Sequence, residues 1–380
     1  MEPVADEQKK ELKLFFRRGL VFAAPYLIFF IFTTYLFVAS GELASIKNVV
    51  RRQQLGKREI LLGLAYSNPI FYYKLHSVLK RKPEALVLGS SRTMQFRAQF
   101  FSDPAIFFNS GGGVDKIKHF KIFLNKIPLG QEPKLLIIGL DQNFFSEQWN
   151  ASSPDYDVED KYRAPESRAH IMITQWTKLY KDFFNHKFSF STLTQRDPLV
   201  DKVGFNALAQ GNGFRSDGSR YEFSIIHTDP AEHLQSIFDA SAEFPPGSVD
   251  SRSLNELDLF LEEASRRGIH VIGFLPPYAP KLHGLMALFK EQLGYIFKLK
   301  SAVDPIFKKH HFMVYDFTDA LVFGSSNTEF IDIHHGSEKT YLRLFIKMAG
   351  ADEFLRQYVN IDQLKETLRT ATNDLEVFGD

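Results

Sequence analysis

The sequence predicts an α/β fold: a three-layer sandwich with a mostly parallel sheet, an inserted cap region and one N-terminal transmembrane helix. Five short apolar segments, each typical of a buried strand, alternate with amphipathic segments that are typical of helices. This alternation favours a parallel sheet that helices cover on both faces. Ahead of these segments, residues 19–40 form a run of 22 residues without a charge, which is long enough to cross a bilayer.

The transmembrane anchor is predicted at residues 19–41. A buried core helix would normally show a polar face, and this run has none. A cleaved signal peptide is the closer alternative, because Val38-Ala39-Ser40 resembles a cleavage site, but the apolar run is longer than the core of a usual signal peptide. Basic residues directly before the run favour a short cytoplasmic N-terminus, residues 1–18. The rest of the chain is then expected on the periplasmic or extracytoplasmic side of a single-pass inner-membrane protein.

The domain organisation follows from where the alternation starts, breaks and ends. We expect a helical stalk at 42–82, an α/β domain at 83–350 and a charged helical tail at 351–380. Strands are expected at 84–88, 105–108, 134–139, 269–275 and 312–317, and helices at 114–127, 253–267, about 282–300 and after residue 335. Residues 145–250 break the pattern and are interpreted as an insertion that caps the strand ends, with a helix around 168–185.

Composition excludes several classes of function. The 46 Lys and Arg residues nearly balance 45 Asp and Glu, so the chain lacks the basic excess expected of a nucleic-acid-binding protein. The absence of cysteine excludes disulfides, thiolate nucleophiles, Cys-ligated zinc and iron–sulfur clusters. Adjacent histidines point in different directions on regular elements, and the Gly111–Gly113 turn lacks the spacing and lysine of nucleotide loops. We therefore expect no metal and no cofactor.

Ser91 is the candidate nucleophile. Ligands of parallel sheets bind at the carboxyl ends of the strands, and Ser91 follows the first expected strand in the turn Gly89-Ser90-Ser91. There its hydroxyl would project beside backbone N–H groups that can hold an oxyanion. The simpler alternative is a helix-capping serine, because Gly-Ser-Ser turns are common.

Asp332 and His335 are the candidate partners of that serine. If they open the last helix, side chains three residues apart share a face, and the carboxylate can orient an imidazole toward the serine. A serine needs such a base, since an unassisted hydroxyl is a poor nucleophile at neutral pH. An N-capping aspartate followed by a partly exposed histidine is the alternative. His334 is a second possible base, but the spacing favours His335.

Further turns supply candidate binding groups. The Gly-rich turn at Gly111–Gly113 and the polar turn at Asp141–Asn143 follow the second and third expected strands, where they could add oxyanion donors. Arg215 lies in a segment of the insertion whose Asn-Gly and Asp-Gly pairs predict a hairpin turn, which by itself explains these residues. Arg215 is also a candidate contact for an anionic or sugar ligand.

These motifs together resemble the SGNH/GDSL hydrolase superfamily, whose signature is a Ser after the first strand, a Gly turn after the second, an Asn after the third and a C-terminal Asp-x-x-His. The single-pass anchor, the GSSR at Gly89–Arg92, the FNSGGG turn and the YDFTD…DIHH ending most resemble its membrane-anchored branch. That branch contains the DltD-type proteins of teichoic-acid D-alanylation and the AlgX/AlgJ-type proteins of alginate O-acetylation. The resemblance covers residues 83–145 and 250–350 and implies an SGNH-like three-layer sandwich.

The resemblance also implies roles for individual residues. Ser91 would be the nucleophile, His335 the general base and Asp332 the residue that orients the base. The oxyanion hole would take the Ser91 amide together with Gly112 or Gly113.

The sequence departs from the family pattern at two positions. Ser90 stands where the family has an Asp before the nucleophile. The Gly-x-Asn block reads Gly139-Leu140-Asp141, so a carboxylate stands where an amide donor is expected, and it would repel an oxyanion unless protonated or turned away. Asn143 is the predicted substitute donor.

The expected function is that of a membrane-anchored extracytoplasmic O-acyltransferase, which moves an acetyl or other small acyl group onto a cell-envelope or secreted polysaccharide through an acyl-Ser91 intermediate. The resemblance implies two partners: a multi-span membrane-bound O-acyltransferase as acyl donor and the polysaccharide as acceptor. Two alternatives stay open. One is an SGNH-type carbohydrate esterase or deacetylase, and the other, suggested by Asp141, is a non-catalytic glycan-binding subunit of a polysaccharide-modification complex.

Overall fold

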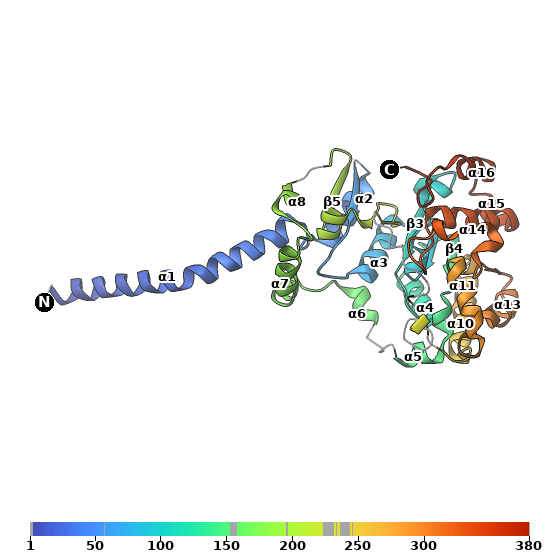
Figure 1. The fold of residues 1–380 in the computed structure, drawn as a ribbon, viewed down its shortest axis with the longest axis horizontal. Coiled ribbons are helices and arrows are strands. Elements are labelled where there is room, and N and C mark those ends of the chain that lie inside the picture. Colours follow the sequence, from blue (N-terminus) through green and yellow to red (C-terminus); the bar gives the residue numbers. More distant parts are fainter. Residues whose placement is uncertain are drawn as a thin grey trace.

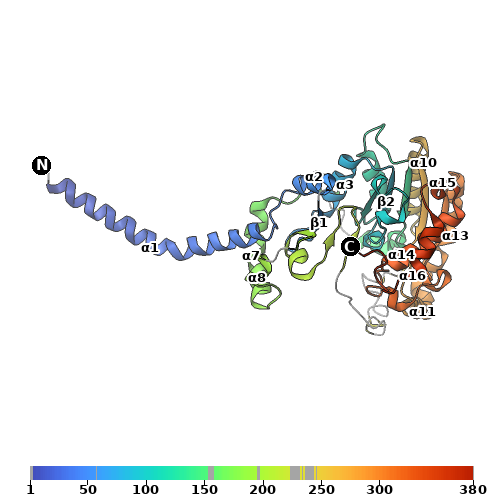
Figure 2. The ribbon, with the colours of Figure 1, turned by 90° about the horizontal axis from the view of Figure 1, so that it is seen from above.

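In the computed structural model, the protein consists of a long N-terminal helix and a folded body. The structure describes residues 3–379 except 57, 153–157, 195–196, 223–231, 233, 236–243 and 245. Helix α1 (Pro3–Ala39) projects from the body along most of its length (Figures 1 and 2). Its Gln8–Ala39 part is the one helical stretch of the described chain that is long and apolar enough to cross a membrane.

The main sheet has five strands, all parallel, in the order β3-β2-β4-β8-β9. Each of the five strands expected from the apolar segments is present: β2 (Ala85–Gly89), β3 (Phe107–Gly111), β4 (Leu135–Gly139), β8 (His270–Leu275) and β9 (Met313–Asp316). The α/β class and the parallel sheet are therefore confirmed. Because all strands run the same way, their carboxyl ends meet at one edge of the sheet.

Helices cover both faces of this sheet, as two neighbouring residues of β8 demonstrate. A Cβ atom at Gly273 would meet Phe307 of α13 (Leu299–Lys309), whereas the next residue, Phe274, packs on Tyr341 of α14 (Glu338–Ala351). Successive strand residues point to opposite faces, so α13 and α14 lie on opposite sides. Helix α10 (Ser251–Arg266) packs between α13 and α4 (Ile117–Asn125) in the first of these layers (Figure 1).

The prediction that residues 42–82 form a stalk was wrong, because this segment is part of the folded body. It forms α2 (Ile46–Leu55), β1 (Glu59–Leu62) and α3 (Ile70–Arg81). Strand β1 joins three strands of the insertion in a second sheet, of order β5-β1-β6-β7. These are β5 (Val200–Val203), β6 (Gly213–Phe214) and β7 (Arg220–Tyr221). The physical reason is burial: α3 carries apolar and aromatic side chains that need a covering surface, namely Phe71, Tyr72, Tyr73, Leu75 and Val78.

The insertion also contributes helices, the first of which packs on the main domain, where Asn150 donates to Asp250 and Ser253. These helices are α5 (Glu147–Ser152), α6 (Val158–Arg163), α7 (Arg168–Phe184), α8 (Phe190–Thr194) and a π-helical turn at Asn206–Gln210. Residues 153–157, 195–196, 223–231, 233, 236–243 and 245 of the predicted insertion lie outside the described residues. Near the C-terminus, the helix expected at about 282–300 is split into α11 (Pro280–Met286) and α12 (Lys290–Leu293), while α15 (Glu353–Arg356) and α16 (Ile361–Thr370) form the tail.

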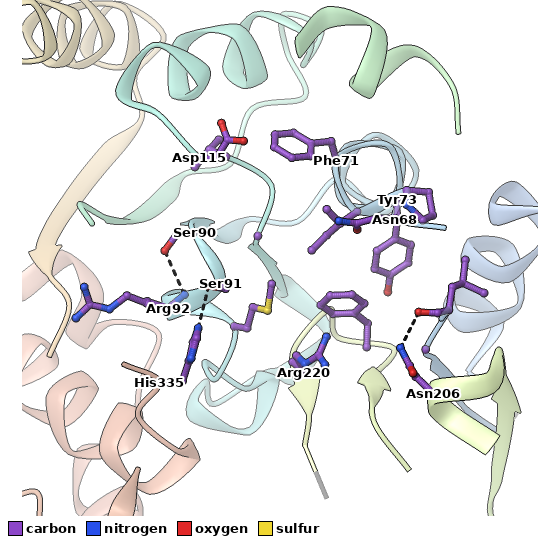
Figure 3. Close-up of a pocket in the computed structure, with 18 of the residues that line it drawn as sticks. Asn68, Phe71, Tyr73, Ser90, Ser91, Arg92, Asp115, Asn206, Arg220 and His335 are labelled. Atoms are coloured by element: carbon purple, nitrogen blue, oxygen red, sulfur yellow. Dashed lines mark hydrogen bonds between the residues drawn. The ribbon is translucent and has the colours of Figure 1, made fainter. Parts of the chain in front are cut away.

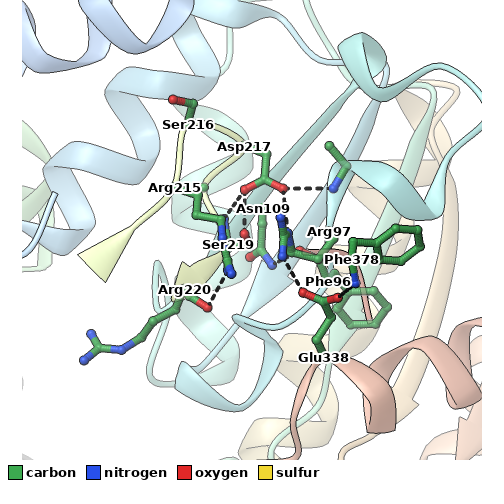
Figure 4. A network of polar contacts seen from close by, with 12 residues as sticks. Phe96, Arg97, Asn109, Arg215, Ser216, Asp217, Ser219, Arg220, Glu338 and Phe378 are labelled. Carbon is green, nitrogen blue, oxygen red and sulfur yellow. Dashed lines mark hydrogen bonds and ion pairs between the residues drawn. The ribbon is translucent and has the colours of Figure 1, made fainter. Parts of the chain in front are cut away.

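A buried ionic network joins the second sheet to the main domain. Arg97 forms an ion pair with Glu338, at the start of α14, and its Nε lies 3.5 Å from an oxygen of Asp217, in the turn between β6 and β7 (Figure 4). Asp217 also accepts hydrogen bonds from the N–H groups of Ala98 and Ser219. The guanidinium therefore links two carboxylates that lie 121 positions apart in the chain.

Candidate active site

Ser91 lies at the carboxyl end of β2, on a turn that three strands hold in place. It begins a single 3₁₀ turn, and the Ser90 hydroxyl caps that turn by accepting the N–H of Arg92 at 3.2 Å. Behind it, a Cβ atom on any of the three strand-end glycines would come within 2.7 Å of the Thr93 side chain. These glycines are Gly89, Gly111 and Gly139. The close approach fixes the turn against the sheet edge and leaves the Ser91 side chain exposed.

The predicted serine, histidine and aspartate meet at this edge. The Oγ atom of Ser91 lies 2.9 Å from Nε2 of His335, although 244 positions separate the two residues (Figure 3). On the other side of the ring, Nδ1 of His335 lies 2.7 and 2.9 Å from the two carboxylate oxygens of Asp332. The hydroxyl, imidazole and carboxylate thus form one hydrogen-bonded chain, which is the geometry of a nucleophile, its base and the group that orients the base.

The Asp332–His335 segment is a turn and not the opening of a helix. One carboxylate oxygen of Asp332 accepts the backbone N–H groups of His334 and His335, both at 2.8 Å. Helix α14 begins only at Glu338, with Ser337 as its N-cap. The expectation that the two side chains share a helix face was therefore wrong, and they meet because the aspartate folds the backbone around itself.

The aspartate is held in its ionised form. Burial raises the pKa of Asp332, but the hydrogen bond and charge of the His335 ring, with the N–H groups of His334 and His335, outweigh burial and lower the pKa to about 2. An ionised carboxylate accepts the Nδ1 proton of His335, which leaves Nε2 as the acceptor that faces Ser91.

The backbone N–H groups of Gly112 and Gly113, which were predicted as oxyanion donors, already donate hydrogen bonds within the protein. The N–H of Gly112 donates to the carbonyl oxygens of Gly89 and Ser90, each at 2.9 Å, and the N–H of Gly113 donates to Ser110 at 2.9 Å. Backbone groups already paired in this way are not available to a substrate oxygen. Gly112 has a φ of 79°, a left-handed conformation that lets the backbone turn tightly. Inside such a turn the N–H group points toward the protein's own carbonyl oxygens.

Two other donors are available at the site. As the first residue of its 3₁₀ turn, Ser91 has an N–H without an intrahelical partner, and none of the described residues accepts it. Asn143 lines the same pocket as Ser91. Its side-chain oxygen accepts the hydroxyl of Tyr295 at 3.5 Å, so its NH₂ group is directed elsewhere. The Ser91 amide and the Asn143 side chain are therefore the candidate oxyanion donors.

Asp141, which departs from the family pattern, lines the same pocket as Ser91 but is paired with neighbouring side chains. Its carboxylate accepts the Ser90 hydroxyl at 2.9 Å and lies 3.3 Å from the Arg92 guanidinium. Burial alone would lower the pKa of Arg92, but the charge of Asp141 contributes most to raising it overall. The repulsion expected between Asp141 and an oxyanion is reduced, because the carboxylate charge is neutralised by Arg92.

Arg92 is a positioning residue that the sequence analysis did not single out. Its buried guanidinium donates to Gln142 at 2.6 Å and to the carbonyl oxygens of Pro276 and Pro277 at 2.9 and 2.7 Å, and it lies 4.1 Å from the Tyr278 ring centroid. These contacts tie the Ser91 turn to the ends of β4 and β8. An arginine next to a turn serine carries no pattern that would reveal such contacts from the sequence.

The site opens into a pocket of about 890 Å³ between the main domain and the second-sheet region (Figure 3). Besides Ser91 and His335, its lining includes residues from the segment predicted as a stalk and from the insertion, among them Tyr66, Asn68, Lys178, Asn206, Phe214 and Arg220. The His334 ring also lines the pocket and packs near the Tyr278 ring. A space of this size accepts a ligand of several linked rings or an extended chain.

Arg215, the predicted ligand contact, is instead part of the buried structure. Its guanidinium donates to the Arg220 carbonyl at 3.1 Å, forms an ion pair with Glu376 at 3.4 Å and covers the Tyr221 ring. The side chain is 5% exposed and does not line the pocket. Arg220, from the same hairpin, does line this pocket, and it also lines a smaller cavity to which Ser91, Asp332 and His335 contribute.

Comparison with known proteins gives no further guide to the site. No protein-family model matches the chain, and no curated protein matches it. Within the described residues, no group of three or more His, Asp or Glu side chains is arranged to hold a metal ion.

Proposed function

We propose that the protein is a membrane-anchored serine acyltransferase of the SGNH/GDSL type, in which Ser91 carries the acyl group. The observation that carries the proposal is the 2.9 Å contact between the Ser91 hydroxyl and Nε2 of His335, with Asp332 on the opposite ring nitrogen. The parallel-strand order and the position of Ser91 at a strand end support the same assignment.

The reaction has two halves. In the first, Oγ of Ser91 attacks the carbonyl carbon of an acyl donor while Nε2 of His335 takes the hydroxyl proton, and the tetrahedral oxyanion accepts hydrogen bonds from the Ser91 N–H and Asn143. Collapse breaks the bond to the leaving group, which receives the proton from His335, and leaves an acyl-serine. In the second half an acceptor hydroxyl gives its proton to His335 and attacks the acyl-serine. Collapse then breaks the bond to Oγ of Ser91, which takes the proton back from His335, and releases the ester product and the free serine.

A polysaccharide hydroxyl is the proposed acceptor, and an acetyl or similar small acyl group is the proposed cargo. The large pocket around Ser91 supports a polysaccharide substrate, because it has room for several sugar rings. The apolar α1 supports an anchor in a membrane. The extracytoplasmic side of the cytoplasmic membrane is the proposed location of the body, because basic residues directly precede the apolar run. A multi-span membrane acyltransferase that delivers the acyl group to Ser91 is the proposed donor.

Replacement of the nucleophile tests the proposal directly. We expect Ser91→Ala and His335→Ala each to lower the rate of acyl transfer by several powers of ten, and the double variant to be no slower than either single variant, because the two residues act as one unit. The measurement is transfer of a radiolabelled acetyl group from an activated ester to purified glycan by the full-length chain in detergent. Losses that multiply in the double variant contradict a shared nucleophile–base unit.

The same assay separates the alternative functions. Label on the glycan supports the transferase, whereas label released as the free acid supports an esterase that uses water. Labelling of Ser91 by a fluorophosphonate probe reports its reactivity without any acceptor. Absence of labelling in the wild-type chain, with glycan binding unaffected by Ser91→Ala, would instead favour a non-catalytic glycan-binding subunit.

A further inference from the structure

One face of the last turns of α1 packs against the folded body, so lipid cannot surround these turns. Thr33, Leu36 and Phe37 are at most 4% exposed, and the Phe37 ring packs edge-on against Tyr66. The free apolar part of α1 is therefore Gly19–Phe32, which has 14 residues. At 1.5 Å per residue it covers about 21 Å, against roughly 30 Å of hydrocarbon. The missing length cannot come from the N-terminal side without drawing Arg17 and Arg18 into the hydrocarbon, which is unfavourable for charged side chains.

Helix α7 supplies apolar surface at the level where α1 enters the body. Ile173 and Phe184 are each 72% exposed and Trp176 is 41% exposed, and with Tyr180 they occupy one face of the helix. Another face is polar and exposed, and it includes Thr174, Lys178 and Lys181. The third face, with Ile171 and Leu179, is buried. An exposed apolar face beside a separate basic face is typical of a helix at a membrane interface.

The apolar faces of α7 and α1 form one continuous surface. The Phe29 ring stacks on Tyr180 with centroids 5.3 Å apart and meets Trp176 edge-on at 5.6 Å. On the same turns of α1, apolar side chains stay exposed away from the body: Ile31, Tyr35 and Val38 are 65, 53 and 60% exposed. Figures 1 and 2 both place α7 at the end of the body from which α1 projects. The surface that continues from a lipid-facing helix is expected to face lipid as well.

We propose that the apolar face of α7, formed by Ile173, Trp176, Tyr180 and Phe184, is immersed in the outer interface of the bilayer and completes the apolar thickness that α1 lacks. The proposal rests on the membrane anchor of the proposed function. Trp and Tyr are the side chains that favour this depth, because their rings are apolar and their polar atoms reach water. Lys178 lines the active-site pocket from the same helix, so the immersion also sets the pocket's distance from the membrane.

The two tryptophans of the chain make the immersion measurable. In full-length Trp149→Phe protein, Trp176 is the single tryptophan, and in full-length Trp176→Phe protein it is Trp149, in α5 on the main-domain side. Both are reconstituted in phosphatidylcholine–phosphatidylglycerol vesicles that contain a doxyl-labelled lipid. We expect Trp176 to be quenched several-fold more than Trp149, and more by a doxyl group near the headgroup than by one near the bilayer centre. Equal, weak quenching of both tryptophans overturns the proposal and leaves the face for a protein partner.

A charge-insertion pair supplies the matched control. We expect the double substitution Ile173→Asp and Phe184→Asp, in the Trp149→Phe background, to abolish most of the quenching of Trp176 while the protein still floats with vesicles through α1. The equally exposed apolar pair Leu321 and Val322, replaced by Asp, should leave the quenching unchanged. Unchanged quenching in the α7 variant overturns the immersion. Loss of flotation in the wild-type chain contradicts the membrane anchor itself, and Ser91 labelling tests the chemistry separately.

Discussion

At the scale of single residues, the site depends on the charge state of Asp332. The carboxylate fixes the tautomer and orientation of His335, and its two backbone acceptor bonds hold the turn that carries both residues. Because this group is ionised and hydrogen-bonded in the folded state, its pKa is lowered from 3.8 to about 2. A lowered carboxyl pKa links the stability of the fold to pH.

Asp332→Asn should therefore destabilise the protein in a pH-dependent way. The stability that the ionised carboxylate adds to the fold is complete above its unfolded pKa near 3.8. This stability is lost as the pH falls through the folded pKa of about 2. We expect the difference in melting temperature between wild type and Asp332→Asn to be largest at pH 6 and to shrink toward pH 2. Acyl transfer at pH 7 should fall by a few powers of ten, because asparagine stabilises the wrong histidine tautomer.

Thermal unfolding of the full-length chain in detergent checks the stability difference. The matched control is Glu262→Gln, at an exposed carboxylate on α10, for which only a small change in melting temperature is expected. If the difference in melting temperature between wild type and Asp332→Asn stays constant from pH 6 to pH 2, ionisation of Asp332 is not linked to the stability of the fold.

At the scale of elements, three strand ends converge on one threonine. Thr93 is fully buried two residues after Ser91, and the ends of β2, β3 and β4 approach it so closely that each needs a glycine there. The turn geometry of Ser91 is thus imposed by packing against the sheet edge.

Gly139→Ala should disturb this packing and the site with it. The new Cβ would lie 2.1 Å from Cγ2 of Thr93, so the turn must shift. We expect a loss of about 1–3 kcal/mol in the free energy of unfolding and slower fluorophosphonate labelling of Ser91. Gly350→Ala in α14, where nothing lies within 4 Å, should be neutral or stabilising by at most about 1 kcal/mol. Wild-type stability and labelling in Gly139→Ala would refute the packing argument.

At the scale of the whole molecule, the pocket exists because two regions are held together. One wall is the main domain with Ser91, and the other includes the second sheet, whose hairpin turn is tied to the main domain by Asp217 and Arg97. Burial alone would raise the pKa of Asp217, but the charge of Arg97 and hydrogen bonds from Ser219 and Ala98 lower it.

Arg97→Met should loosen this junction, since it leaves two buried carboxylates, Asp217 and Glu338, without their cation. We expect a loss of about 3–5 kcal/mol in unfolding free energy at pH 7. The loss should be smaller at acidic pH, where protonation of the unpaired Asp217 removes the buried charge. Urea unfolding at pH 7 and pH 5 measures both effects. Lys134→Met, which breaks an exposed pair with Glu84, should cost less than about 1 kcal/mol and serves as control.

Much of the main domain could be predicted from local sequence. The strands β2, β4 and β8 are apolar runs of five or six residues that are buried along nearly their whole length, and burial on both faces requires such runs whatever their neighbours. The second sheet could not be predicted, because β6 and β7 have two residues each and carry no periodic pattern.

The sequence by itself determined the chemistry available to the protein: an apolar helix, a parallel sheet with polar turns, and a serine, a histidine and an aspartate of suitable types. Only the tertiary structure decided which groups are free to act. It turned the Gly112 and Gly113 amides inward, paired Asp141 with Arg92, and buried Arg215 while Arg220 reached the pocket. The physical reason is that a residue's type fixes which hydrogen bonds it can make, whereas its long-range neighbours fix which of them are already made.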